Sequence, residues 1–244
     1  MNFVVSSDGL IMPRDSEIDF ALLYADFNSP IMALDCGDRC GPYNERGIPF
    51  CCDLRHAVPS AYRAEWEYLK ANTDLWKEWQ GRDANETANL NEQAPEGQTL
   101  IACKGYAYCQ RDFRSITCRS FPFFPYITRQ GAFIGLAYYW EYETRCWVIS
   151  NLRSITPQYL GEFIATYETL FRAMPQELET YRHYSGTMRR VFGRQRRAIP
   201  LLHRNGSLYK VTPRNGRMRR ARAEELPHFG PYHIAAELPF SDGT

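Results

Sequence analysis

The stretch CGDRCGPYNERGIPFCC, residues 36–52, decides how this chain is organised. Glycine, proline and asparagine favour turns along it, and it carries two pairs of thiols, Cys36 with Cys40 and Cys51 with Cys52. Four more cysteines follow farther along the chain, at Cys103, Cys109, Cys118 and Cys146. The pattern indicates irregular loops whose thiols share a chemical task.

The beginning of the chain bears on the redox state of these thiols. Residues 1–15, MNFVVSSDGLIMPRD, lack a basic segment, and polar and acidic residues interrupt their apolar patches. We therefore expect no secretory signal and a cytoplasmic protein. A reducing cytoplasm disfavours a disulfide framework, so metal binding is the leading explanation for eight thiols.

Length and composition are those of a globular protein. The chain has 244 residues, enough to bury roughly 70% of its unfolded surface and to fold without crosslinks. No apolar run approaches the ~18 residues that span a bilayer, so no transmembrane segment is expected. We find no Ser–His–Asp order, P-loop or dinucleotide-binding loop, which leaves hydrolytic and nucleotide-dependent reactions without support.

Hydrophobic periodicity predicts an α+β fold, a small mixed domain with amphipathic helices, a β-hairpin and irregular cysteine-rich metal-binding loops. Helices are expected over residues 59–79 and 157–184, with a helical turn or strand at 17–23. Strands are expected at residues 98–103 and 208–211, a hairpin from 131–142 and 145–150, and a polar loop at 81–98. The predicted regions are an N-terminal extension (1–33), a cysteine-cluster metal-binding domain (34–180) and a basic C-terminal region (181–244).

Thiolates are soft ligands, and four of them satisfy either a tetrahedral zinc ion or an iron–sulfur cluster such as [4Fe–4S]. The C-x3-C spacing of Cys36 and Cys40 places two sulfurs within one turn. Cys51 and Cys52 are adjacent, so one can ligate while the other packs, or each can serve a different site. Eight thiolates are enough for two four-coordinate sites without proving two. His56 is an alternative nitrogen ligand, although a solvated or capping histidine is the more common case.

The order of these elements resembles the YkgJ-type cysteine-cluster family, a family described as a zinc- or iron-chelating domain. The resemblance covers about residues 34–170 and rests on CGDRCGPYNERGIPFCC, LIACKGYAYC, TCRSFPFFPY and RCWVISNL. The Cys-Arg-x-Phe-Pro element that begins at Cys118 is the most specific match. The resemblance implies that all eight cysteines, Cys36 to Cys146, are metal ligands.

Two departures from the family pattern change what the resemblance implies for single ligands. The family has a tight C-x2-C-x2-CC, whereas here GPYNERGIPF separates Cys40 from Cys51, and the middle elements read CKGY and CQRD. The inserted residues either loop out and leave the metal geometry intact, or alter which thiolates coordinate.

Three classes of function follow. The first is a metal-binding protein without an assigned activity. The second is a metal-dependent protein lysine N-methylase, because a relative with this cysteine pattern, the flagellin lysine-N-methylase, combines an iron–sulfur centre with S-adenosylmethionine. The third is an interaction module with a structural metal and a basic nucleic-acid-binding region.

Charge along the chain is uneven. Thirteen Arg or Lys and no Asp or Glu lie between Arg182 and Arg222, and the remainder holds sixteen basic against twenty-eight acidic residues. Residues 182–222 therefore either pack against the acidic remainder of the protein or attract an acidic partner. Nucleic acid is a further candidate partner, although no RNA-binding motif supports it.

Residues beside the thiols are further candidates. Arg119 either stabilises neighbouring thiolates or donates to loop carbonyls. The aromatic run after it is expected to shield the metal in an apolar wall formed by Phe121, Phe123, Phe124 and Tyr126. Glu65 and Glu67 are carboxylate candidates whose default position is a solvated helix face.

Overall fold

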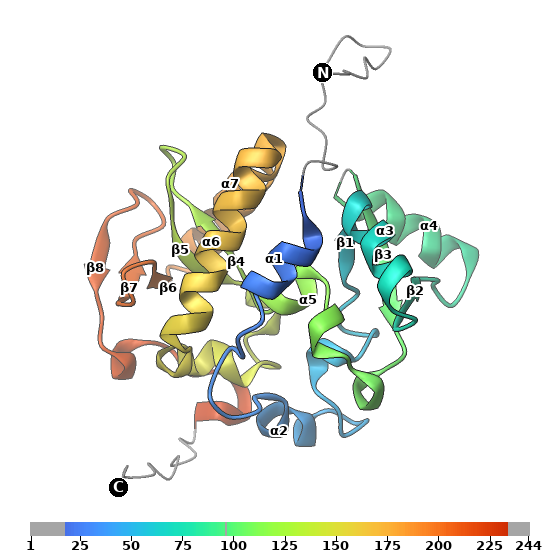
Figure 1. Ribbon diagram of the computed structural model, residues 1–244. Helices are drawn as coiled ribbons and strands as arrows, with labels where there is room; N and C mark the ends of the chain where they lie inside the picture. The colour runs from blue at the N-terminus through green and yellow to red at the C-terminus, as the bar shows by residue number, and fades with distance from the viewer. Residues whose placement is uncertain (1–17, 96, 234–244) are drawn as a thin grey trace, which may run out of the picture.

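The fold combines helices with two antiparallel sheets, so the predicted α+β class is confirmed. The computed structural model describes residues 18–95 and 97–233. The larger sheet has the order β4 (Phe123–Ile127), β5 (Phe133–Tyr138), β6 (Ile199–His203), β7 (Leu208–Val211), β8 (Met218–Arg220). The smaller sheet has the order β1 (Ser60–Tyr62), β3 (Gln98–Cys103), β2 (Trp76–Glu78). The two sheets lie on opposite sides of the molecule in Figure 1, with α1 (Phe20–Asp26) between them.

Two long helices, α6 (Pro157–Ala173) and α7 (Pro175–Arg194), lie against the larger sheet. The Thr156 hydroxyl caps α6 by accepting a hydrogen bond from the Tyr159 amide at 3.2 Å. The predicted apolar stripe is buried, and it consists of Tyr159, Leu160, Phe163, Ile164, Tyr167 and Leu170. The single helix expected over 157–184 is divided instead, because Pro175 has no amide to continue α6 and begins α7.

The hairpin prediction is wrong about which segment pairs with residues 131–142. β5 pairs with β4, whereas residues 147–154 form a 3-10 segment, η7 (Trp147–Ser154). All five residues of β4 are buried. The sequence therefore lacks the alternation of apolar and polar residues that marks a strand with one exposed face. β4 is an edge strand, which tolerates Pro125, and the Ser185 hydroxyl of α7 accepts a hydrogen bond from the Ile127 amide at 2.9 Å.

The helix predicted over residues 59–79 is shorter than expected. Residues 60–78 form β1, then the helix α3 (Arg63–Asn72), then β2. The Glu65 side chain accepts a hydrogen bond from the Tyr62 amide at 3.0 Å, which starts α3 at Arg63. The strands predicted at 98–103 and 208–211 are confirmed as β3 and β7.

The polar segment 81–98 is a helix in part, and the loop prediction is wrong for α4 (Ala84–Gln93). The Asp83 carboxylate accepts a hydrogen bond from the Glu86 amide at 2.8 Å. Glu86 in turn pairs with Arg82, so a capped first turn supports a helix without an apolar stripe.

One apolar core joins segments from both ends of the described chain. It includes Phe20 of the predicted N-terminal extension and Val211 of the predicted basic region. Helix α7 is continuous across the predicted division at residues 180 and 181. The region expected as a helical turn or strand at 17–23 contributes the start of the helix α1, which Asp19 caps by accepting a hydrogen bond from the Leu22 amide. The expectation about a secretory signal concerns residues 1–15, which lie outside the described residues.

Within residues 18–95 and 97–233, no helix has the length and apolar character that crossing a membrane requires.

Candidate metal centre

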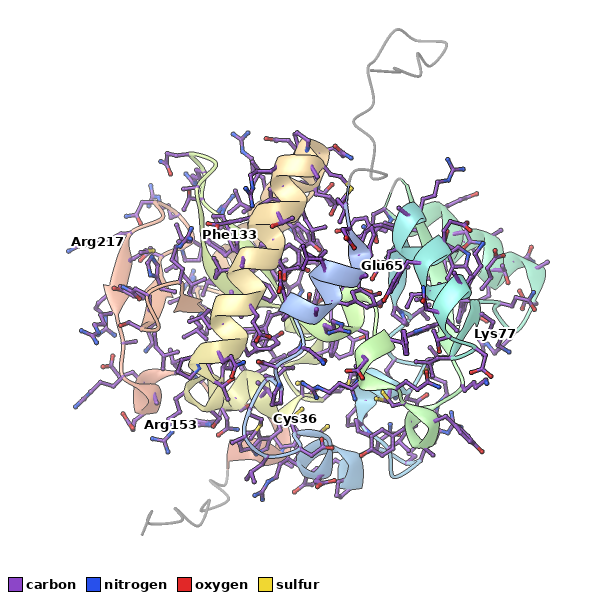
Figure 2. The ribbon with its side chains drawn as sticks, viewed as in Figure 1. Cys36, Glu65, Lys77, Phe133, Arg153 and Arg217 are labelled. Atoms are coloured by element: carbon purple, nitrogen blue, oxygen red, sulfur yellow. The ribbon has the colours of Figure 1, made fainter. Side chains whose placement is uncertain are left out.

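All eight cysteines line one cavity of about 620 Å³. They come from separate segments of the chain, and each carries a free thiol. Cys51 and Cys109 are exposed, Cys40 is buried, and the others are half-buried. Figure 2 shows Cys36 near the lower edge of the molecule, below α1 and close to α2 (Gly37–Cys40). The fold therefore places all eight predicted site residues on the wall of one cavity.

The first pair of thiols flanks a single helical turn. Cys36 precedes α2, and Cys40 ends it. The Asp35 carboxylate accepts a hydrogen bond from the Gly37 amide at 2.7 Å, which fixes the entry into this turn. A side chain at Gly37 would collide with the Pro49 ring, so the glycine allows the residues after Cys40 to return against α2. The inserted segment, residues 41–50, therefore folds back on α2 instead of extending away from it.

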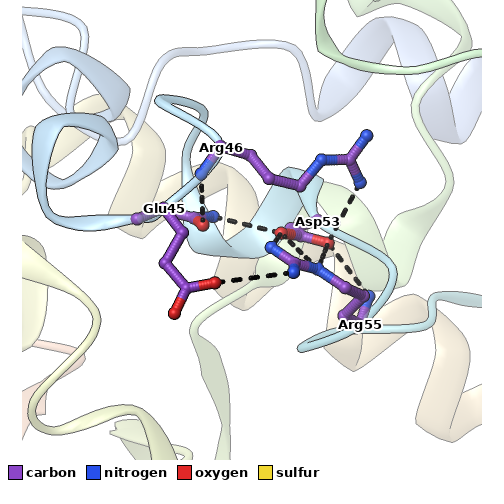
Figure 3. A network of polar contacts seen from close by, with 5 residues as sticks. Glu45, Arg46, Asp53 and Arg55 are labelled. Carbon is purple, nitrogen blue, oxygen red and sulfur yellow. Dashed lines mark hydrogen bonds and ion pairs between the residues drawn. The ribbon is translucent and has the colours of Figure 1, made fainter.

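Asp53 anchors the turn that holds the second pair, η3 (Phe50–Cys52) (Figure 3). Its enclosed carboxylate pairs with Arg55 at 2.7 Å and Arg46 at 3.6 Å. The Asn44 amide also donates to it at 3.3 Å. These hydrogen bonds, above all those from Arg55, hold the pKa of Asp53 well below its ordinary value. The ion pairs join the inserted segment to the chain just after Cys52.

Three thiols come from the side of the smaller sheet. Cys103 ends β3 opposite Trp76 of β2, and Cys109 follows the short turn η4 (Tyr106–Tyr108). Cys118 lies in α5 (Ile116–Ser120), where its amide donates to the capping Ser115 hydroxyl at 3.2 Å. The Trp76 indole donates to the Phe113 carbonyl at 2.7 Å, which ties β2 to the loop between these cysteines.

Arg119 is a structural residue rather than a thiolate partner. Its buried guanidinium donates to a set of backbone carbonyls, those of Tyr24, Phe27, Arg111, Asp112 and Arg114. Of the two roles that the sequence left open, the structure shows the second, in which Arg119 holds α1 and the loop before α5 together.

Arg114 is the arginine that meets the thiols, and the sequence reasoning missed it. Its Nε donates to the Cys109 Sγ at 3.0 Å. Although burial opposes the charged form, negative charge on Cys118, Cys109 and Cys52 raises the pKa of Arg114. Only its position four residues before Cys118, with Cys109 five residues earlier, could have suggested this role from the sequence.

Cys146 completes the cavity from the side of the larger sheet. It precedes η7, and its amide donates to the Tyr142 carbonyl at 2.9 Å. The Tyr142 hydroxyl donates to the His56 carbonyl. This bond ties the segment before Cys146 to the segment after Cys52, so the two sides of the cavity are joined at its wall.

Burial opposes the ionisation of five of the thiols, those of Cys36, Cys40, Cys103, Cys118 and Cys146. Burial is the main cause that raises the pKa of Cys36 and of Cys118, each to about 12. Burial likewise raises the pKa of Cys40, Cys103 and Cys146. The hydrogen bond between Cys51 and Cys52 lowers the pKa of Cys52, with help from Arg114, and raises that of Cys51.

Of the other candidates, His56 and Phe121 line the cavity, whereas the rest of the aromatic run lies in the core. His56 lines the cavity, with its ring 5.1 Å from that of Phe50. Phe121 also lines it, so one residue of the expected aromatic wall is in place. The rest of that run, Phe123, Phe124 and Tyr126, is buried in β4 within the core. The wall is smaller than predicted because the run is a strand whose residues pack into the core.

The two glutamates have different positions. Glu65 is fully buried, so its expected solvated position is wrong. It accepts hydrogen bonds from the Tyr24 hydroxyl and the Ile116 amide, both at 2.6 Å, besides the Tyr62 amide. Burial raises the pKa of Glu65 to about 7. Glu67 is exposed and pairs with Lys70 at 2.9 Å, as expected for a solvated helix face.

The basic segment 182–222 makes ion pairs within the protein. Arg197 pairs with Glu143 at 2.5 Å, and Arg204 pairs with Glu168 at 2.6 Å. Both acidic partners lie before residue 182, so part of the basic charge meets the acidic remainder, one of the two readings left open by the sequence.

The donor set fits a thiolate-bound metal group, although the sulfurs do not meet at one point. Among the residues that the structure describes, no three His, Cys, Asp or Glu side chains converge closely enough to hold a metal ion. The thiols instead surround a shared space. Soft sulfur donors of this kind suit zinc and iron–sulfur clusters.

Comparison with protein-family models gives no match, and comparisons with curated proteins and with solved structures give no significant match. The resemblance to the YkgJ-type cysteine-cluster family therefore stays a prediction.

Proposed function

We propose that this protein binds metal through cysteine thiolates and that the bound group is an iron–sulfur cluster. The observation that carries the proposal is the placement of all eight cysteines on the wall of one cavity. Segments as distant in sequence as Cys36 and Cys146 contribute to it. A core that needed only packing would have no reason to collect every thiol of the chain in one place.

Electrostatics supports a cationic occupant. Burial and mutual repulsion oppose negative charge on most of these thiols, as the raised pKa values of Cys36 and Cys118 indicate. Arg114 compensates part of that charge. A metal cation would compensate the remainder, because a coordinated thiol gives up its proton.

The size of the cavity favours a cluster over a single ion. A tetrahedral zinc ion draws four sulfurs to about 2.3 Å from one centre. Here the thiols line about 620 Å³, and no three of them converge as that geometry requires within the described chain. A cluster contains several metal and sulfide atoms and so accommodates more widely spaced thiolates.

The test is metal and sulfide analysis of protein purified without oxygen, together with an absorption spectrum. An iron–sulfur protein is brown and absorbs broadly near 400 nm, and acid-labile sulfide accompanies the iron. A colourless protein with stoichiometric zinc would contradict the cluster while retaining thiolate binding. Protein without any metal would contradict both.

Two variants make the test residue-specific. Cys118→Ser removes a predicted ligand from the most specific sequence element, and we expect metal-depleted or insoluble protein. His56→Ala removes the non-thiol candidate on the same wall, and we expect unchanged metal content. Full metal content in Cys118→Ser would show that this thiol is not a ligand.

The other two functions remain predictions with their own measurements. A lysine N-methylase would bind S-adenosylmethionine when fully loaded with metal, and calorimetry would detect it. A nucleic-acid-binding module would lose affinity steeply with salt and upon neutralisation of the arginines in residues 182–222.

A further inference from the structure

Another hollow, of about 350 Å³, lies on the surface where α7 meets the turn between β4 and β5. It is lined by Arg129, Glu179, Arg182, His183, Gly186, Arg189 and Arg190. Among these residues, Glu179 is the only carboxylate. None of them lines the thiol cavity, so the basic hollow is a separate feature of the molecule.

The backbone of the β4–β5 turn orients two of the four guanidinium groups. The Arg189 Nη1 donates a hydrogen bond to the Ile127 carbonyl at 2.8 Å. The Arg182 Nη2 donates to the Arg129 carbonyl at 3.4 Å. The Arg189 guanidinium carbon also lies 5.5 Å from the centre of the Tyr126 ring. Because these contacts position the side chains in advance, less conformational entropy is lost when a ligand binds to them.

Gly186 allows two guanidinium groups to approach the same point of the helix surface. A Cβ atom on Gly186 would lie 3.6 Å from both the Arg189 Nη2 and the Arg190 Nη1. Two positive charges that meet in this way repel each other, and an anion placed between them would replace the repulsion by attraction. The arrangement therefore favours a negatively charged ligand above Gly186.

Most of the positive charge in the basic hollow has no carboxylate partner. Within residues 18–95 and 97–233, Arg129, Arg189 and Arg190 form no ion pair. Arg182 pairs with Glu179 at 3.3 Å, and both side chains are exposed. Four guanidinium groups against one carboxylate leave an excess of three positive charges in a small volume.

The size of this excess indicates the class of anion. Guanidinium groups bind phosphoryl oxygens through paired hydrogen bonds. One phosphoryl group carries only about two negative charges, so it compensates part of the excess. A nucleic-acid strand spreads one charge over each ~3.4 Å of its length, which places few charges in so compact a hollow. Linked phosphoryl groups concentrate more charge and match the four arginines better.

We propose that the basic hollow binds a polyphosphate group, such as pyrophosphate or triphosphate, through Arg129, Arg182, Arg189 and Arg190. The described residues that line it include no Phe, Tyr or Trp on which a base could stack, so the phosphoryl groups themselves are recognised. This binding function goes beyond the proposed metal centre and does not depend on it.

Calorimetric titration of the full chain, purified without oxygen, tests the proposal at a fixed ionic strength of about 0.15 M. Tripolyphosphate should bind at least about tenfold more tightly than inorganic phosphate, because it makes additional charge-assisted hydrogen bonds. Metal content measured before and after the titration shows that the heat does not come from chelation. Equal affinity for the two anions, or binding of neither, would overturn the proposal.

A matched pair of double variants separates a defined site from diffuse attraction to the basic segment. Arg129→Gln with Arg190→Gln removes two lining arginines and should weaken tripolyphosphate binding on the order of 100-fold. Arg194→Gln with Arg214→Gln removes the same charge from exposed positions outside the hollow and should change affinity less than about threefold. Equal weakening in the two variants would overturn the site. Circular dichroism checks that both fold.

Glu179→Gln gives a test of opposite sign. The substitution removes the one lining carboxylate and releases Arg182, so tripolyphosphate should bind severalfold more tightly than to wild type. The fold should be little affected, because an exposed ion pair contributes little stability. Unchanged or weaker binding would show that the anion does not occupy this hollow. A single-stranded oligonucleotide that binds more tightly than tripolyphosphate would also overturn the assignment.

Discussion

The larger sheet with its helices and the thiol-bearing segments are held together in different ways. In the sheet and helices, side chains such as Phe124 and Phe163 are completely buried in one core. Several of the thiol-bearing segments are turns of three to five residues, namely α2, η3 and α5. They are positioned by polar anchors, chiefly Asp53 and Arg119. The comparison teaches that packing holds the larger sheet with its helices, the scaffold, whereas polar contacts hold the thiol-bearing segments.

The largest expected effect is that of removing the proposed metal group. Structural zinc in zinc-finger peptides contributes an apparent binding energy of roughly 10–16 kcal/mol. We expect chelation to open residues 36–52 and 103–118 locally, so that their amide hydrogens exchange on the order of 100-fold faster. Amides of β4, β5 and β6 should keep their protection. Hydrogen exchange with mass spectrometry measures both regions in one sample, and collapse of the sheet along with the loops would remove the distinction.

A substitution in the core of the scaffold should lower the free energy of unfolding and leave the metal content of the folded protein unchanged. Phe163 is fully buried, and its ring centre lies 4.6 Å from that of Tyr167. We expect Phe163→Ala to lower the free energy of unfolding by about 3–5 kcal/mol, because it leaves a cavity in the core. Metal content of the folded protein should stay at the wild-type level. Leu22→Ala is the matched control, since Leu22 is 59% exposed and its substitution should change little.

Glu65 should make the free energy of unfolding depend on pH. It lies where α1, α3 and α5 meet (Figure 2). Its pKa is about 7 in the folded protein, above the ordinary 4.5, chiefly because of burial. The folded state therefore holds more protons than the unfolded chain between these values. The free energy of unfolding should fall by about 3 kcal/mol as pH rises from 4.5 to 7 and then level off.

Glu65→Gln tests this directly, since glutamine does not titrate. The difference in unfolding free energy between wild type and variant, measured in urea at a series of pH values, cancels the titration of the shared thiols. A difference that does not change with pH would show that Glu65 does not carry the effect.

The smallest effect concerns the basic segment. Arg204 and Glu168 are both partly exposed, at 41% and 45%. We expect Arg204→Gln to cost only ~0.2–1 kcal/mol of unfolding free energy, and less at high salt. Arg214→Gln is the control, because the described residues give Arg214 no ion pair. A loss of several kcal/mol would show that the basic segment is a larger part of the scaffold than its exposure indicates.

The sequence predicted the elements that have a strong local signal. The helical stripe of α6 and the short strands β3 and β7 were found because their apolar spacing is regular. The β4–β5 pairing was missed because β4 is buried on both sides and reads as an aromatic run. The helix α4 was missed because its stability comes from the Asp83 cap rather than an apolar face.

The candidate site was predictable in its residue types and not in its arrangement. Cysteine is rare enough that its order alone selected eight of the residues that line the cavity, the eight cysteines. Which arginine meets the thiols depends on tertiary geometry, so Arg119 stood out in the sequence although Arg114 makes the contact.

X-ray absorption spectroscopy at the iron and zinc edges of anaerobically purified protein tests the central claim most directly. We predict an iron centre whose first coordination shell consists of sulfur alone, with iron–iron scattering beyond it. A first shell of nitrogen and oxygen, or protein that holds neither metal, would contradict the account.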